Sequence, residues 1–280
     1  MRAALRHQRA DGAAILTIGC DAAGCSRLRD LYQRAPCRLL FPDVEREEPL
    51  QAVLLTTTGG LTGGDRTSVT FNVGADARAT LTTQAAEKLY RALPTQPAVM
   101  CTVSLTAATG AWTEWLAQET ILFNGARLRR SFSADLEPGS RMLAVESVVF
   151  GRKAMGEEFQ VGMLHDSWRI RRAGRLVWAD AMRLDDFARQ RRAPFGFGDA
   201  IACSTMLYAG GDAATLLEPV RALLEAAADE SGVTLIDDLL IIRMLDGDVP
   251  KLRSRVLNVA GFIRHTAAGC SRTLPRVWHC

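Results

Sequence analysis

Short runs of alternating apolar and polar residues occupy most of the chain. In the run 99–106, Val99, Cys101, Val103 and Leu105 fall on one face and Met100, Thr102, Ser104 and Thr106 on the other, the two-residue period of a half-buried strand. Similar strand-like runs occur at 13–19, 37–41, 53–58, 68–73, 78–83, 112–116, 121–123, 127–132, 142–150, 167–170, 176–182, 204–208 and 239–245. The pattern predicts a mainly β fold.

Turns that contain glycine separate many of these runs in a loose repeat. Gly74, Gly110 and Gly139 each stand with a small residue just before a new strand, at intervals of 36 and 29 residues. The intervals are too irregular for a short-period solenoid. They fit strands that stack coil upon coil in an irregular β-layered body.

Only the last quarter of the chain has the three-to-four-residue period of a helix. Its first apolar stripe consists of Leu216, Leu217, Val220, Leu223 and Leu224. We expect this helix near 215–231, with Thr215 and Glu218 as a capping box and Gly232 as its end. A second helix is expected near 249–265, with Asp248 as its N-cap. The prediction is therefore a single β-rich domain over residues 1–280 with two α-helices near the C-terminus.

Composition and charge restrict the possible functions. The 280 residues are 48% hydrophobic, enough for a sizeable core, and the net charge of +3 is too small to indicate a nucleic-acid partner. Arginine runs at 169–175 and 189–192 leave nucleic-acid binding as a weak alternative, which a steep salt dependence would reveal. No apolar run reaches the ~18 residues of a membrane span. Seven cysteines without a C-x-x-C pair favour neither disulfides nor zinc and fit a cytoplasmic protein.

Two pairs of adjacent glycines, followed by an aspartate, mark the most unusual stretch of the chain. Gly59, Gly60, Gly63 and Gly64 precede Asp65, and such glycines indicate a sharp turn or close backbone approach. No lysine and hydroxyl residue follow, so the stretch is not a phosphate-binding loop. We expect valine at Gly63 to clash, and alanine at Gly60 to be tolerated if only flexibility is needed there.

Candidate chemistry is sparse. The four histidines form no metal-binding pair and no serine lies in G-x-S-x-G, which favours a protein that is not an enzyme. A stable nickel site would need imidazole or thiolate ligands at fixed spacing. Isolated acids remain: Glu146 and Asp180 in apolar runs, and Asp65. Because a buried carboxylate is costly unless paired or hydrated, each is either a structural ion-pair partner, with Arg152 or Arg183 for instance, or part of a wet site.

Several motifs in order along the chain resemble the UreD/UreH family of urease accessory proteins. They are GGLTGGD, LTTQAAEKLYR, EWLAQETILFNGA, GRKAMGEEF, GFG and the terminal LPRVW. The resemblance covers nearly the whole chain and implies an irregular β-helix-like stack of strands that carries a pair of α-helices. The sequence departs from many members of that family at Glu87 and Leu89, on either side of Lys88 in the second motif.

The resemblance also implies a function. It points to a non-enzymatic chaperone and scaffold of urease maturation, which assembles with a UreF-like protein, and through it a UreG-like GTPase, on apo-urease. Nickel would be a transient cargo in an internal, water-filled passage without a tight site, and the matching metal-passage acids are Asp65, Glu146 and Asp180. The other residues expected at the passage or an interface are Gly60, Gly63, Gly64, Lys88, Tyr90, Arg91, Glu119, Arg152 and Trp278.

Two alternatives stay open on the residues alone. A metal-dependent hydrolase with a β-rich fold would use Asp65, Glu146 and Asp180 as ligands around an open coordination position. Trp278 in the terminal tail is either an interface anchor, as Trp often is, or a cap on the helical layer.

Overall fold

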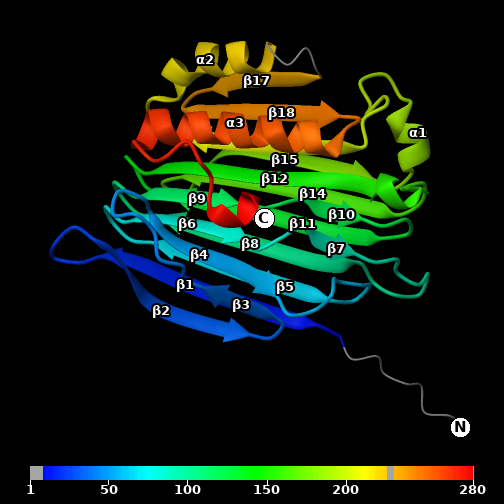
Figure 1. The fold of residues 1–280 in the computed structure, drawn as a ribbon, viewed down its shortest axis with the longest axis horizontal. Coiled ribbons are helices and arrows are strands. Elements are labelled where there is room, and N and C mark those ends of the chain that lie inside the picture. Colours follow the sequence, from blue (N-terminus) through cyan, green and yellow to red (C-terminus); the bar gives the residue numbers. More distant parts are fainter. Residues whose placement is uncertain (1–8, 226–229, 280) are drawn as a thin grey trace, which may run out of the picture.

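Two β-sheets that face each other make up most of the protein (Figure 1). The structure is a computed structural model that describes residues 9–225 and 230–279. The seven-stranded sheet contains β1 (Asp11–Cys20), β2 (Ser26–Arg34), β5 (Arg66–Val73), β8 (Val99–Ala107), β11 (Arg127–Leu136), β14 (Met163–Arg172) and β15 (Arg175–Leu184). The eleven-stranded sheet contains β3 (Cys37–Leu40), β4 (Leu50–Thr56), β6 (Arg78–Thr83), β7 (Glu87–Leu89), β9 (Trp112–Leu116), β10 (Thr120–Leu122), β12 (Arg141–Arg152), β13 (Glu157–Glu158), β16 (Ala202–Ala209), β17 (Ser231–Ile236) and β18 (Leu239–Asp246).

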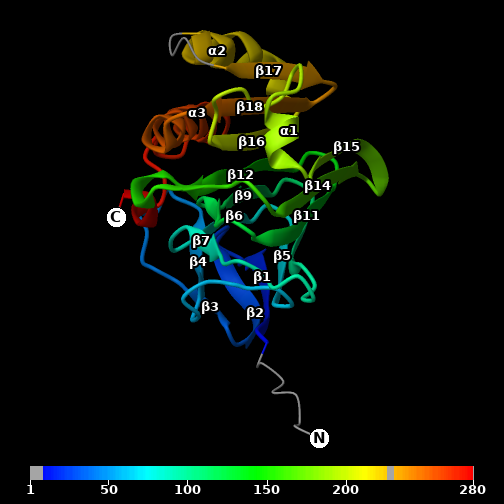
Figure 2. The same cartoon turned by 90° about the vertical axis from the view of Figure 1, so that its right-hand side faces the viewer.

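The chain passes repeatedly from one sheet to the other, so that successive coils stack. Strands β5, β8, β11 and β14 are parallel neighbours in one sheet, and β4, β6, β9 and β12 are parallel neighbours in the other. Figure 2 shows β4, β6 and β9 on one side and β5, β11 and β14 on the other. This arrangement confirms the predicted mainly β, β-helix-like stack, and antiparallel strands extend it at both ends.

The main core fills the space between the two sheets. Phe71, Leu105 and Phe132 point inward from successive strands of the seven-stranded sheet, and Leu81 and Trp115 meet them from the other. All five are at most 3% exposed. Burial of this apolar surface stabilises the stack by roughly 25 cal/mol per Å², and it holds the coils in one register.

A short third face closes one side of the stack. Leu61 bridges Leu89 of β7, β7 pairs in parallel with β10, and β10 pairs in parallel with β12. Leu61, Leu89, Leu122 and Phe150 are buried in one cluster along this face. The glycine-rich segment and the Lys88–Arg91 segment, far apart in the sequence, are therefore adjacent rungs of the stack.

The helices lie at one end, against the eleven-stranded sheet. Helix α3 (Val249–Ala268) packs Leu252, Val256 and Ile263 against β16, β18 and β12. Asp248 Oδ1 accepts a hydrogen bond from Lys251 N at 3.0 Å, which confirms the predicted N-cap. A one-turn helix, α1 (Phe187–Arg191), is too short to show a helical period and was not predicted.

The first predicted helix is displaced. Helix α2 (Ala213–Glu225) begins before Thr215, residues 226–229 lie outside the described residues, and β17 begins at Ser231. Because Thr215 lies inside α2 and its Oγ1 donates to Asp212 O at 2.7 Å, the predicted capping box with Glu218 is wrong. Across the ranges that the structure describes, every helix is too short or too polar to cross a bilayer.

Candidate functional site

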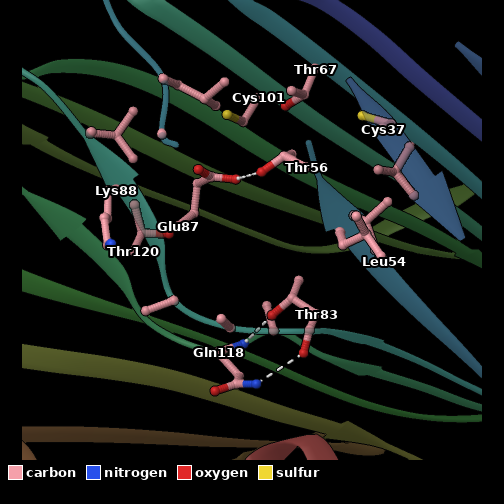
Figure 3. A pocket seen from close by; sticks show the side chains of 18 of the residues that line it. Cys37, Leu54, Thr56, Thr67, Thr83, Glu87, Lys88, Cys101, Gln118 and Thr120 are labelled. Atoms are coloured by element: carbon pink, nitrogen blue, oxygen red, sulfur yellow. Dashed lines mark hydrogen bonds between the residues drawn. The ribbon is translucent and has the colours of Figure 1, made fainter. Parts of the chain in front are cut away.

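A cavity of about 300 Å³ lies between the sheets, behind the third face (Figure 3). Its wall includes the glycine-rich turn, the connection from β6 to β7, and inward-facing residues of both sheets. The polar or titratable side chains in its lining include Cys37, Thr56, Thr67, Thr83, Glu87, Lys88, Cys101, Gln118, Thr120, Arg130 and Glu146. The cavity is thus wide enough for several waters and mixed in character.

Glu87, which in the sequence is only a departure from many members of the family, lines the first cavity. It accepts a hydrogen bond from Thr56 Oγ1 at 2.9 Å, and Figure 3 shows the two side chains facing each other in the cavity. Burial raises the pKa of Glu87, against the opposing effects of Thr56 and Lys88. A carboxylate at this position gives the cavity a ligand for a cation or a proton.

A second cavity, of about 200 Å³, lies further along the stack. Its lining comes from β14, β15, β16, β18 and the loop after α1, and includes Asp166, Asp180, Cys203 and Arg243. Asp180 forms an ion pair with Arg243 Nη2 at 2.5 Å. Asp180 therefore both lines a cavity and has an ion-pair partner, though not the Arg183 that the sequence suggested.

Three buried charges stand between the two cavities. Arg130 and Glu146 line the first cavity, and Asp166 lines the second. Arg130 Nε lies 3.1 Å from Glu146 Oε2 and donates to Asp166 Oδ1 at 3.1 Å, while its Nη2 donates to Asp166 Oδ2 at 2.5 Å. We call Glu146, Arg130 and Asp166 the partition triad. Each member is at most 7% exposed.

The stacking of coils explains how these residues meet. Thr67, Cys101, Arg130 and Asp166 are register partners on β5, β8, β11 and β14. They form one column that runs across the strands, and residues in register on parallel strands face the same side of a sheet. Glu146 of β12 faces this column from the other sheet.

Burial dominates the electrostatics of the triad. Burial raises the pKa of Glu146 to about 7, although Arg130 opposes the shift; Asp166 adds to it. Burial alone would lower the pKa of Arg130, but the two carboxylates outweigh it and raise that pKa above its ordinary value. Burial likewise raises the pKa of Cys101 and Cys203 to about 12. The thiols near the triad thus stay protonated, and oxygen atoms are its available ligands.

Asp65 lies elsewhere. Its carboxylate accepts hydrogen bonds from Thr62 N at 2.8 Å and Ala10 N at 2.9 Å, which closes the glycine-rich turn onto the start of β1. It is buried and belongs to the lining of neither cavity. The geometry therefore supports a structural role for Asp65 and does not place it with Glu146 and Asp180.

The condition under which alanine would be tolerated at Gly60 is not met, because the position needs more than flexibility. Gly60 has φ +139°, and a Cβ there would lie 2.6 Å from Lys88 O. Its neighbour Leu61 donates to that same carbonyl at 2.8 Å, so the rung itself excludes a side chain. At Gly63 a Cβ would meet Ala92 Cβ and Gln96 Cβ at 2.9 Å, which agrees with the expected clash. Gly64, with φ +92°, needs glycine for its conformation.

The remaining residues of the second motif face outward beside the first cavity. Lys88, which also contributes to the cavity lining, is exposed. Tyr90 donates from its hydroxyl to Gly59 O at 2.7 Å, and the Arg91 carbonyl accepts from Thr62 Oγ1 at 3.2 Å. These contacts tie the motif to the glycine-rich turn.

Arg152 pairs on the outside with a different acid from the one proposed. Its Nε contacts Glu157 Oε2 at 2.6 Å, and its guanidinium lies 3.9 Å from the ring centroid of Phe123. It does not pair with Glu146, whose cationic neighbour is Arg130.

Arg130 and Asp166 were missed because neither lies in an apolar run. The sequence does contain one signal for Arg130. Gly110 and Gly139, which precede successive strands, are 29 residues apart, and the same interval separates Cys101 from Arg130.

Trp278 and Glu119 belong to a packed corner beneath α3. Trp278 is 2% exposed, donates from Nε1 to Thr82 Oγ1 at 2.9 Å, and lies under the Arg253 guanidinium. Arg253 also pairs with Glu119 at 2.7 Å. In this arrangement Trp278 caps the helical layer, and its ring is not available as an interface anchor.

No group of three or more His, Cys, Asp or Glu side chains within residues 9–225 and 230–279 is arranged to hold a metal ion. Asp65, Glu146 and Asp180 therefore do not form the shared ligand set that the hydrolase alternative needs. The fold and the site define a class: a stacked-strand scaffold with two cavities of mixed polar and apolar lining, whose walls share a cluster of buried charges.

Comparison with known proteins gives the family. The sequence model of the UreD urease accessory protein family matches residues 10–279. Relatives called urease accessory protein UreD include those of Rhizobium leguminosarum bv. viciae, 38% identical over 99% of this chain and 98% of the relative, and Magnetococcus marinus, 38% identical over 91% and 89%. One from Rhodopseudomonas palustris is 41% identical over 91% of this chain and 88% of the relative. The chain belongs to the UreD family of urease accessory proteins.

Proposed function

We propose that the protein is a non-enzymatic scaffold of urease maturation that conducts nickel along the axis of its β-stack. Nickel is its cargo, and the route leads through the first cavity, past the partition triad, into the second. The observation that carries the proposal is the position of Glu146, a buried carboxylate that lines the first cavity and pairs with Arg130, which in turn pairs with Asp166 in the lining of the second. No donor in the described part of the chain gives Glu146 Oε2 a hydrogen bond.

The chemistry of the lining suits a cargo that must leave again. Carboxylates and hydroxyls bind Ni²⁺ less tightly than the imidazole and thiolate ligands of stable sites, and protonated thiols are poor ligands. Glu87, Glu146 and Asp180 offer carboxylates in turn along the two cavities. Each would replace part of the hydration shell for a short time, as a passage requires.

The decisive experiment is Glu146→Gln, which keeps the side-chain shape and removes the charge. Co-expressed with urease and the other accessory proteins, the variant should assemble normally but load less nickel into urease, measured by metal analysis of the purified enzyme. Glu114→Gln is the matched control, because Glu114 is also buried and ion-paired, with Arg264 at 3.0 Å, yet lines neither cavity. Normal nickel content with Glu146→Gln would refute the passage.

The proposal also includes partners. The protein would bind apo-urease on one surface and a UreF-like protein on another, and the UreF-like protein would bring a UreG-like GTPase that supplies nickel. The support is family membership. A pull-down from extract should recover urease subunits and the UreF-like protein, and recovery of the UreG-like protein should depend on the UreF-like one. Direct capture of the GTPase by the purified chain alone would contradict this order.

A further inference from the structure

We infer that the partition triad is a latent divalent-cation site in which the Arg130 guanidinium stands in the cation's place. While Arg130 bridges Glu146 and Asp166, the junction between the cavities is closed. It opens when a divalent cation takes the guanidinium's position and Arg130 moves aside. This inference rests on the proposed function for its cargo, but not for the existence of the site.

The first argument is geometric. Glu146 Oε2 and Asp166 Oδ1 each lie 3.1 Å from the same atom, Arg130 Nε, so the two oxygens are no further apart than twice that distance. Two carboxylates from opposite sheets that converge on one point are the arrangement a divalent cation uses, directly or through water. Thr120 Oγ1 accepts a hydrogen bond from Arg130 Nη1 at 3.3 Å and is a further, neutral oxygen next to the guanidinium.

The second argument concerns hydrogen bonds. The Nε–H of Arg130 is directed at Asp166, and within the described residues Glu146 Oε2 has no hydrogen-bond partner despite complete burial. An unsatisfied buried carboxylate oxygen is unfavourable. The guanidinium satisfies Asp166 well and Glu146 poorly, whereas a cation between the carboxylates would serve both.

The third argument is charge balance. Glu146 and Asp166 share one guanidinium in a buried site, so without it two negative charges at short range are unfavourable and a proton or another cation must take its place. A divalent ion neutralises them, and the two adjacent cavities supply space for its remaining water ligands. The nearby Cys203 thiol is held protonated by burial, so the site should bind nickel through oxygen and release it.

The test is Arg130→Gln in the full chain, purified with a cleavable tag that contains no histidine. Ni²⁺ binding is measured by equilibrium dialysis, and the melting temperature is measured with and without Ni²⁺. The variant should bind Ni²⁺ at least about tenfold more tightly than the wild type, and Ni²⁺ should raise its melting temperature or soluble yield. Arg130→Gln combined with Glu146→Gln and Asp166→Asn should lose this binding.

Two controls separate a site from general destabilisation. Arg130→Lys keeps a cation in place and should bind Ni²⁺ no better than the wild type. Arg264→Gln removes a buried guanidinium from Glu114, away from both cavities. This variant should bind Ni²⁺ no more tightly than the wild type, and Ni²⁺ should not change its soluble yield.

The inference is overturned if Arg130→Gln binds Ni²⁺ no more tightly than the wild type and Ni²⁺ changes neither its melting temperature nor its soluble yield. This holds whether the variant folds or not. It is also overturned if Arg264→Gln gains the same binding. Failure of nickel delivery is a separate result: urease could load normally with Glu146→Gln while Arg130→Gln still binds Ni²⁺. That outcome would refute the passage and keep the latent site.

Discussion

Glu146 should make the stability of this protein fall as the pH rises from about 4.5 to about 7. Burial raises its pKa from 4.5 to about 7, so over this interval the folded protein holds a proton that the unfolded chain has released. Stability falls with pH wherever the folded state binds more protons. The contribution is therefore complete below pH 4.5 and is lost as the pH passes through the folded value.

The size of the effect follows from the shift. At about 1.4 kcal/mol for each pKa unit, the raised value corresponds to about 3 kcal/mol across the interval. Glu146→Gln cannot ionise and should not show this component. Relative to the wild type, the variant should gain about 3 kcal/mol in free energy of unfolding between pH 4.5 and pH 7.5.

Urea denaturation followed by tryptophan fluorescence, at half-unit steps of pH, measures this difference. Ser147→Ala is the control, because Ser147 is buried on the same strand and does not titrate; its curve should run parallel to that of the wild type. If the difference in free energy of unfolding between the wild type and Glu146→Gln does not change with pH, the reasoning is refuted. A difference of opposite slope would mean that attraction to Arg130, 3.1 Å away, outweighs burial.

Three further changes test the structural assignments. Gly60→Ala should lower the free energy of unfolding by about 2–4 kcal/mol from backbone strain and overlap, whereas Gly211→Ala, with no heavy atom near its Cβ, should stay within about 0.5 kcal/mol; equal values in urea denaturation would contradict the close approach. Trp278→Ala should cost about 3–5 kcal/mol, measured in the same way, and a loss of partner binding at unchanged stability would restore the interface role. Arg264→Gln should cost about 3–5 kcal/mol because it leaves buried Glu114 unpaired, and an unchanged melting temperature would contradict this.

The strands were predictable where burial alternates, because that signal is local. The run 99–106 is β8 with little change. Strand β2 was missed because most of its residues are exposed and it carries no apolar face, and β7 and β13 are too short to show a period. The end predicted for the first helix, near residue 231 with Gly232 after it, was wrong because both residues belong to β17, which the helical period of the preceding residues does not reveal.

The candidate site divides in the same way. An acid inside an apolar run is visible in a sequence, and both Glu146 and Asp180 line cavities in the structure. Asp65 looked similar, but its carboxylate is used by its own turn. In the sequence, Glu87 is only a departure from many relatives beside Lys88; β7 pairs with β10, and the Glu87 side chain accepts a hydrogen bond from Thr56.

Arg130 and Asp166 could not be found by reading along the chain, because the cavities extend across the strands. Each coil contributes one residue to a wall, and these two, 36 positions apart, become neighbours only through the pairing of β11 with β14. A slip of one residue in that pairing would turn Arg130 to the opposite face of the sheet. The register of the coils, held by the core between the sheets, therefore decides whether the buried charges meet at all. That dependence gives the large apolar core a functional as well as a stabilising role: it fixes the positions of charges that no short sequence motif contains.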